Sequence, residues 1–360
     1  MAWSLNCILI VREPANSTTS CRLYLQSRAA CVYRGELSES CRIEEPCSAE
    51  GLYGLPFVNL STREGFNMKN IILFLLFITV ASVSNYSLAQ QQRPLDNELI
   101  VGYYGRPGTA SLGVLGQYTI EELMPKIKAK AGEYGQITGN QNVTPAFHLI
   151  YGLASSEPGR DKDYILPLSN EKLMEYINAA QSNGFAVIID LQLGGLTPVE
   201  AVKPVLKYLK YDNVHLAIDP EFEVNSLDVR PGKVIGHISG EQINQVQSAM
   251  TDHLNENGIG ENKILIVHMF RESMVKNKEM VKKYDKIDLI MNLDGHGSPK
   301  LKVDIYNNLY TADISAKIAG GFKLFFREDK PSMMTPKQVL GMEPVGDTKI
   351  KEPPKYINYQ

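Results

Sequence analysis

The stretch that decides the fold reads Val-His-Leu-Ala-Ile-Asp-Pro-Glu-Phe and runs from Val214 to Phe222. It begins as an apolar strand and ends with two carboxylates, Asp219 and Glu221. Side chains alternate between the two faces of a strand, so Ala217, Asp219 and Glu221 are predicted to share one face, with the acids at the C-terminal end. Paired carboxylates at the C-terminal end of a buried parallel strand are typical of acid–base centres in barrel enzymes.

The rest of the chain alternates apolar strands with amphipathic helices, which predicts a parallel sheet covered by helices. The predicted strands are residues 99–105, 145–152, 185–192, 214–221, 263–270, 287–294, 321–326 and 356–359. The predicted helices are residues 119–132, 169–182, 198–209 and 239–257. This alternation favours an α/β fold, a single-domain (β/α)8 TIM-like barrel over residues 90–360. An open doubly wound sheet is the alternative, but its usual glycine-rich phosphate loop is missing from the sequence.

The first part of the chain differs from the rest. All five cysteines lie in residues 1–67. Met68 then opens a charged start, an apolar run over residues 71–83 and a small-residue exit at Ser87-Leu-Ala89. This is the layout of a secretory signal peptide, and the run is short for a membrane span, which needs about 20 apolar residues.

We therefore predict that residues 1–67 are an upstream extension outside the fold and that residues 68–89 are a signal peptide. The barrel of residues 90–360 would then be secreted or periplasmic, with no stable membrane anchor after cleavage. The alternative is a cysteine-rich N-terminal domain followed by an internal anchor, but an odd number of cysteines does not suit a secreted disulfide framework.

Polar side chains recur where the predicted strands end, and the C-terminal ends of barrel strands meet on one rim. In strand order they are Tyr104 and Arg106, His148 and Tyr151, Asp190 and Gln192, Asp219 and Glu221, His268 and Arg271, then Asn292, Asp294 and His296, and finally Lys323. Burying so many polar groups without a purpose is costly, so together they predict a polar pocket. The structural alternative for Asp190 and Asp219 is to cap loops, and for His148 and His268 to be hydrogen-bonded core residues.

Glycoside hydrolysis is the leading chemistry, because it needs one carboxylic acid and a second carboxylate. Glu221 is the predicted acid, with Asp219 and Asp190 as catalytic partners whose charge raises its pKa. The remaining rim residues from Tyr104 to His296 are predicted to contact a carbohydrate or another small polar substrate.

Two other functions stay open. One is metal-dependent hydrolysis of a phosphodiester or amide by the histidines and carboxylates of the same rim; no tight motif such as H-E-x-x-H occurs, so we predict no metal and no cofactor. The other is a barrel that binds a glycan without cleaving it. The formal net charge of −3 and the lack of a basic stripe predict no nucleic-acid partner.

Residues 218–222 resemble the strand-four D-x-E signature of chitinase-like barrels and of barrel lysozymes. The resemblance implies that Glu221 is the proton donor and that Asp219 assists it. The longer chitinase pattern has acids two and five positions before Asp219, where this chain has Ala217 and Val214.

Most of residues 99–360 also looks like a group of exported bacterial barrel proteins of undefined activity. The similarity implies the fold and export but supplies no reaction. The segments that carry it are residues 215–222, 267–274, 294–299 and 356–360.

Overall fold

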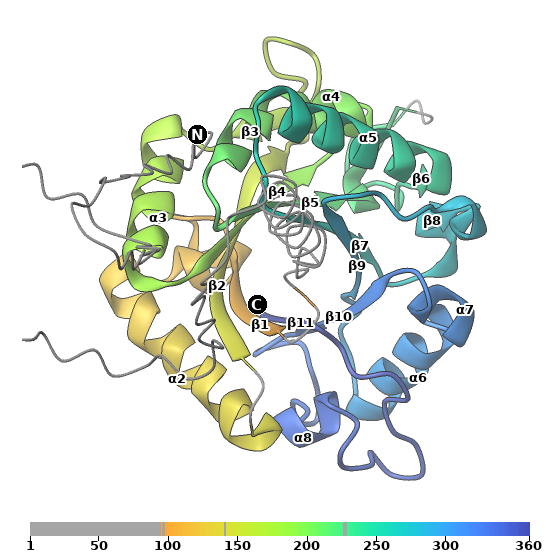
Figure 1. Cartoon of the computed structure of the whole chain (residues 1–360). Coiled ribbons are helices and arrows are strands. Elements are labelled where there is room, and N and C mark those ends of the chain that lie inside the picture. Colours follow the sequence, from red (N-terminus) through yellow and green to blue (C-terminus); the bar gives the residue numbers. More distant parts are fainter. Residues whose placement is uncertain (1–94, 96–97, 140–141, 226–228) are drawn as a thin grey trace, which may run out of the picture. The chain divides into compact units, whose positions relative to one another are not determined.

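The computed structural model describes residues 95, 98–139, 142–225 and 229–360. Residues 90–360 form one compact unit, in which eight parallel strands close into a barrel with helices around it (Figure 1). The predicted barrel is therefore confirmed. The predicted upstream extension (1–67) and signal peptide (68–89) lie outside the described residues.

Each barrel strand pairs in parallel with the next, and the last strand returns to the first through pairs such as Tyr103 with Tyr359. The barrel strands are β1 (Glu98–Gly105), β2 (Asn142–Ala154), β4 (Ala186–Gln192), β5 (Val214–Asp219), β7 (Lys263–Met269), β9 (Ile287–Leu293), β10 (Ala319–Leu324) and β11 (Tyr356–Tyr359). All eight overlap the predicted strands. The sequence patterns missed three short strands: β3 (Ile165–Pro167), antiparallel to β2, and the pair β6 (Ile238–Ser239) and β8 (Val275–Lys276).

The helices begin where capping side chains satisfy the first backbone N–H groups. Thr119 and Glu122 form the capping box of α2, Ser169 caps α3, and Ser239 caps α5. The α-helices are α2 (Ile120–Thr138), α3 (Asn170–Asn183), α4 (Pro198–Val202), α5 (Gly240–Glu256), α6 (Pro299–Leu309), α7 (Ala312–Ser315) and α8 (Pro336–Val339). The 3-10 helices are η1 (Ala110–Leu112), η2 (Val114–Gly116), η3 (Lys203–Lys210), η4 (Pro220–Phe222), η5 (Glu272–Met274) and η6 (Lys278–Met280). The predicted helix over 198–209 is divided between α4 and η3, and no pattern had indicated α6.

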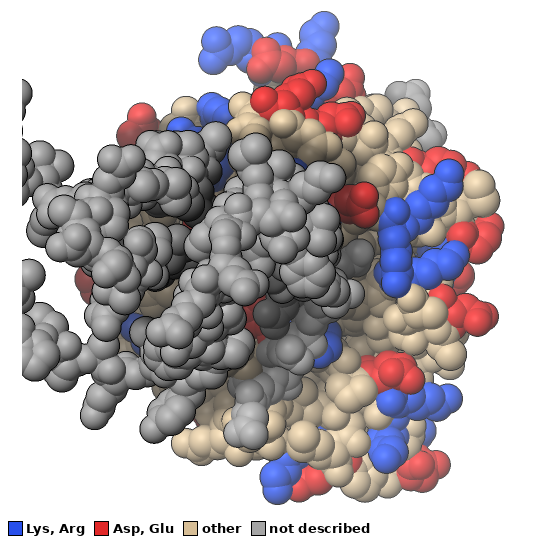
Figure 2. Space-filling model, viewed as in Figure 1, with Lys and Arg blue, Asp and Glu red and all other residues tan. Residues whose placement is uncertain are grey.

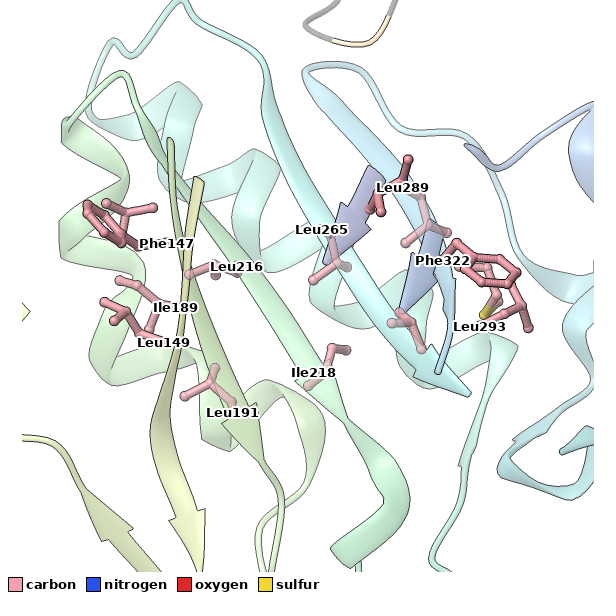
Figure 3. Close-up of a cluster of buried hydrophobic side chains, with 14 of the residues drawn as sticks. Phe147, Leu149, Ile189, Leu191, Leu216, Ile218, Leu265, Leu289, Leu293 and Phe322 are labelled. Atoms are coloured by element: carbon pink, nitrogen blue, oxygen red, sulfur yellow. The ribbon is translucent and has the colours of Figure 1, made fainter. Parts of the chain in front are cut away.

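Apolar side chains fill two separate layers. The outer layer packs alternate strand residues such as Leu216 and Ile218 against the helices; Figure 3 shows part of it. The inner layer lies within the barrel and contains Ala217. Its other buried strand residues are Ile100, Ala146, Ala186, Ile188, Ile264, Ile266, Ile290 and Tyr356. The predicted alternation along β5 is therefore confirmed as far as Asp219.

Glu221 does not continue that alternation, which corrects the prediction of one shared strand face. β5 ends at Asp219, and Glu221 lies in η4. Pro220 has no N–H group for a strand partner, and the Asp219 side chain caps the new turn by accepting a 3.0 Å hydrogen bond from the Glu221 N–H. The two carboxylates are therefore joined by a tight turn at the barrel rim.

The surface carries charges of both signs. On the visible part of the face in Figure 2, basic and acidic side chains are interspersed around the barrel. Among the described residues, no helix has the length and apolar character that crossing a membrane requires.

The inner apolar layer should be a main source of stability. Ile266 is fully buried in it, so Ile266→Ala is expected to lower the free energy of unfolding by about 2–5 kcal/mol, the usual cost of such a cavity. Leu301→Ala, on the exposed side of α6, is the control and should change stability little. Urea unfolding followed by circular dichroism measures both, and equal effects would contradict this account of the core.

Candidate functional site

A layer of buried polar side chains lies above the inner apolar layer, at the C-terminal end of the barrel. Strand register places its members side by side: His148 pairs with Tyr104, and His268 with Asn292. The buried polar members are His148, Asp190, Asp219, His268, Asn292, Asp294, Lys323 and Asn358. Because apolar residues fill the barrel beneath them, these groups can meet a substrate only from the rim.

Three of these side chains meet at the centre. His148 from β2 and His268 from β7 each turn their Nε2 atoms toward Asp190 from β4. The distances to Asp190 Oδ2 are 3.3 Å from His148 and 3.6 Å from His268, and all three side chains are inaccessible to solvent. The His148 and Tyr104 side chains lie within hydrogen-bonding reach of Asp190, but the facing nitrogen and oxygen atoms are poorly aligned for hydrogen bonds. Potential ligand atoms therefore face one another in a closed space.

Each imidazole is oriented by a contact at its Nδ1 atom, on the side of the ring away from Asp190. His268 Nδ1 lies 2.9 Å from Asp294 Oδ2, and His148 Nδ1 is hydrogen-bonded to the Tyr356 hydroxyl. An ionised carboxylate can only accept, so His268 Nδ1 carries the hydrogen in this contact. This leaves both Nε2 atoms directed at Asp190.

Tyr104 and Lys323 cover the cluster. The Lys323 ammonium lies 3.6 Å from the centre of the Tyr104 ring and 3.8 Å from Asp294 Oδ2. The Tyr104 ring packs edge-on against His148, with 4.8 Å between the ring centres. Burial and the nearby charge of Asp190 raise the pKa of Tyr104 well above its usual value, so this phenol stays neutral.

The central carboxylate is held ionised. Burial by itself raises the pKa of Asp190, but the charges of His268 and His148 outweigh it and lower the pKa to about 2. Burial likewise favours neutral His268, yet Asp190 and Asp294 raise its pKa to about 9. For His148 burial dominates and lowers the pKa to about 4. At neutral pH the cluster therefore holds one imidazolium and one neutral imidazole around an anion.

Asp219 and Glu221, which we call the rim pair, have raised pKa values, in contrast to Asp190. Burial, with the negative charge of Asp190 and Asp294, raises the pKa of Asp219 to about 7. Burial and Asp294 also raise the pKa of Glu221, which is only half-buried. At neutral pH Asp219 is therefore partly protonated, whereas Asp190 beside it is ionised.

The loop that follows Asp294 is fixed by a buried ion pair. Lys302 on α6 donates to the Gly295 carbonyl at 2.6 Å and lies 3.2 Å from Asp329. Asp329 in turn accepts a hydrogen bond from the Gly297 N–H at 3.1 Å. These contacts hold Asp294 in place beside His268.

Other predicted site residues lie around this centre rather than in it. The Gln192 side-chain oxygen accepts a hydrogen bond from the Ala154 N–H at 2.8 Å, and the Arg106 side chain donates to the backbone carbonyls of Ile150 and Tyr151. The Tyr151 side chain packs against the outer apolar layer. All three contacts support the barrel walls.

The last two predicted site residues, Arg271 and His296, are exposed. The Arg271 guanidinium stacks on the Phe270 ring, and its charge acts on Glu221. The His296 and Phe325 rings lie edge to face, with 5.9 Å between the ring centres. Both lie in loops after the strands, where predicted, but outside the buried layer.

The sequence interpretation missed Tyr356 and Asn358 of β11. Tyr356 holds His148, and the Asn358 side chain lies 3.5 Å from that of Asn292. The alternation along β11 was the available signal, since it places these two residues on the same face.

Comparison of the chain with models of known protein families and with curated proteins finds no match.

The raised pKa of Asp219 predicts a pH-dependent stability. Between about pH 4 and 7 the folded chain keeps a proton on Asp219 that the unfolded chain releases, so this carboxyl makes stability fall as pH rises. Asp219→Asn cannot ionise, so its stability relative to wild type should rise across this window, by up to about 1.4 kcal/mol per pH unit. Urea unfolding at several pH values, in buffer with a chelator, measures the difference.

The control for this experiment is Asp252→Asn, which removes an exposed carboxylate from α5. Its stability should run parallel to that of wild type at every pH. Parallel curves for Asp219→Asn and wild type would contradict the protonated state of Asp219.

Proposed function

We propose that this chain is an exported glycoside hydrolase-like enzyme that acts on a polysaccharide through Asp219 and Glu221. One observation carries the proposal: Asp219 and Glu221 are joined by a tight turn at the C-terminal end of β5, where their surroundings raise the pKa of both carboxyls while the pKa values of Asp190 and Asp294 are lowered. Carboxyl groups whose environments push their pKa values apart are the usual basis for dividing acid and base roles.

Glu221 is the proton donor in this proposal. It is half-buried at the rim, so its carboxyl can reach a glycosidic oxygen, and its raised pKa favours the protonated form. Asp219 accepts the Glu221 N–H bond and so fixes the turn that carries the donor.

Asp190 has an electrostatic role. It lies deeper than the rim pair, between two imidazoles, and its charge helps to keep Asp219 protonated. The ionised carboxylates also favour the positive charge that develops on a sugar ring during cleavage.

The proposed substrate class and the proposed export depend on different observations. Tyr104, Arg271 and Lys323 provide aromatic and cationic groups near the acids, and such groups suit a polar, hydroxylated ligand. Export depends on the signal-peptide pattern of residues 68–89 alone.

Replacing the donor tests the proposal. Glu221→Gln keeps the shape of the side chain but cannot donate the proton, so hydrolysis should fall by about 10²–10⁴-fold. The assay measures release of reducing ends from polysaccharides and from peptidoglycan fragments. Glu272→Gln, an exposed residue that pairs with Lys278, is the matched control and should keep full activity.

Two results would count against the proposal. Equal activity of Glu221→Gln and wild type would remove the assigned role. Binding of glycans without any turnover by wild type would instead indicate a glycan-binding barrel.

A second candidate, metal-dependent hydrolysis of a phosphodiester or amide, is favoured by one observation. His148, Asp190 and His268 place three possible ligand atoms within 4.8 Å of one another. Hydrolysis of such a substrate that a chelator abolishes, with glycans left intact, would favour it over glycoside cleavage.

A further inference from the structure

We propose that His148, Asp190 and His268 form a binding site for one divalent transition-metal ion, with zinc the best match. The site would lie inside the barrel, beneath the rim pair. It goes beyond the proposed glycoside hydrolysis, which requires no metal.

The donor set and its spacing suit zinc. Two imidazole nitrogens and one carboxylate oxygen are ligands that zinc commonly takes from proteins. Bonds of about 2.0–2.1 Å at tetrahedral angles separate neighbouring donor atoms by about 3.3 Å. The two nitrogen–oxygen separations here are 3.3 Å and 3.6 Å, and all three donor atoms lie within 4.8 Å of one another.

The facing atoms are arranged so that one cation can bind all three of them. When a metal ion displaces the Nε2 proton of His268, whose Nδ1–H stays directed at Asp294, the freed lone pair faces the Asp190 carboxylate. His148 Nε2 approaches the same oxygen atom. Without a metal each Nε2–H can donate to this oxygen, whereas one metal ion in place of the protons binds both nitrogens and the oxygen.

The surroundings of the imidazoles are those of metal ligands. A metal-binding histidine usually donates its other ring N–H to a carboxylate or another oxygen, which fixes the ring and the tautomer. Asp294 does this for His268, and the Tyr356 hydroxyl contacts Nδ1 of His148. The contacts of Lys302 with the loop after Asp294 then hold this outer layer rigid.

The charges around the cluster also suit a divalent ion. Asp190 and Asp294 supply two negative charges, and the only cation that contacts Asp294 besides His268, among described residues, is Lys323. The apolar inner layer closes the barrel below. Three protein ligands leave the fourth position of a tetrahedral ion on the rim side, beneath Tyr104 and Lys323.

The test is zinc binding by the full-length chain, prepared without a histidine tag and treated with a chelator. The five N-terminal cysteines are alkylated in every sample, because thiolates also bind zinc. Calorimetric titration with zinc and elemental analysis should give one ion per chain. Cobalt in place of zinc should give the visible absorption of a tetrahedral site.

Variants then locate the ion. Asp190→Asn and His268→Gln preserve side-chain size and should weaken zinc binding at least 100-fold. Asp294→Asn, outside the ligand set, should weaken it by about 10–100-fold. His215→Gln alters a buried histidine nearer the start of β5, whose Nδ1 accepts from the Ile264 N–H, and should leave zinc affinity unchanged. Circular dichroism verifies the fold of each variant.

Absence of zinc binding by wild type would overturn the proposal, and so would equal affinity of wild type and the folded ligand variants. In either case the cluster is a hydrogen-bonded imidazolium–carboxylate group. Zinc binding is measured without substrate and should persist in Glu221→Gln. The zinc-binding measurement and the glycan-hydrolysis assay can therefore fail independently of each other.

Discussion

The arrangement of the site depends on one buried carboxylate, that of Asp190, held between two imidazoles. An anion inside a barrel is costly unless charged or polar partners surround it. His148 and His268 supply those partners at 3.3 Å and 3.6 Å, and their outer nitrogens require Tyr356 and Asp294 in turn. The buried charge of Asp190 thus requires the two imidazoles, and these in turn require Tyr356 and Asp294.

That charge also links the buried cluster to the rim. Burial, together with the negative charges of Asp190 and Asp294, raises the pKa of Asp219 above them to about 7. The Asp219 side chain fixes the turn that carries Glu221. The buried cluster around Asp190 lies too deep to contact a large substrate. Its charge nevertheless influences the protonation of Asp219 in the rim pair, which can contact one.

The fold was largely predictable from the sequence, because each strand of a closed parallel barrel is apolar on both faces and ends at the same rim. The strands and the caps at Thr119, Ser169 and Ser239 follow from local patterns. The position of Glu221 was less predictable: period-two alternation stops at Pro220, where a 3-10 turn competes with the strand.

The grouping of His148, Asp190 and His268 depends on the closure of the barrel, which brings distant segments together, so no local spacing could reveal it. Tyr151 and Gln192 were placed correctly along the chain, but the β2 backbone irregularity near Gly152 and contacts to the wall decide where they point.

The central claim is that Asp190 and the two imidazoles are built to share one cation. X-ray diffraction from zinc-soaked crystals, recorded on both sides of the zinc absorption edge, tests it most directly. The account predicts one anomalous peak at about 2.0–2.1 Å from His148 Nε2, His268 Nε2 and an Asp190 oxygen. A map without a peak between these atoms, with the imidazoles hydrogen-bonded directly to Asp190, would contradict it.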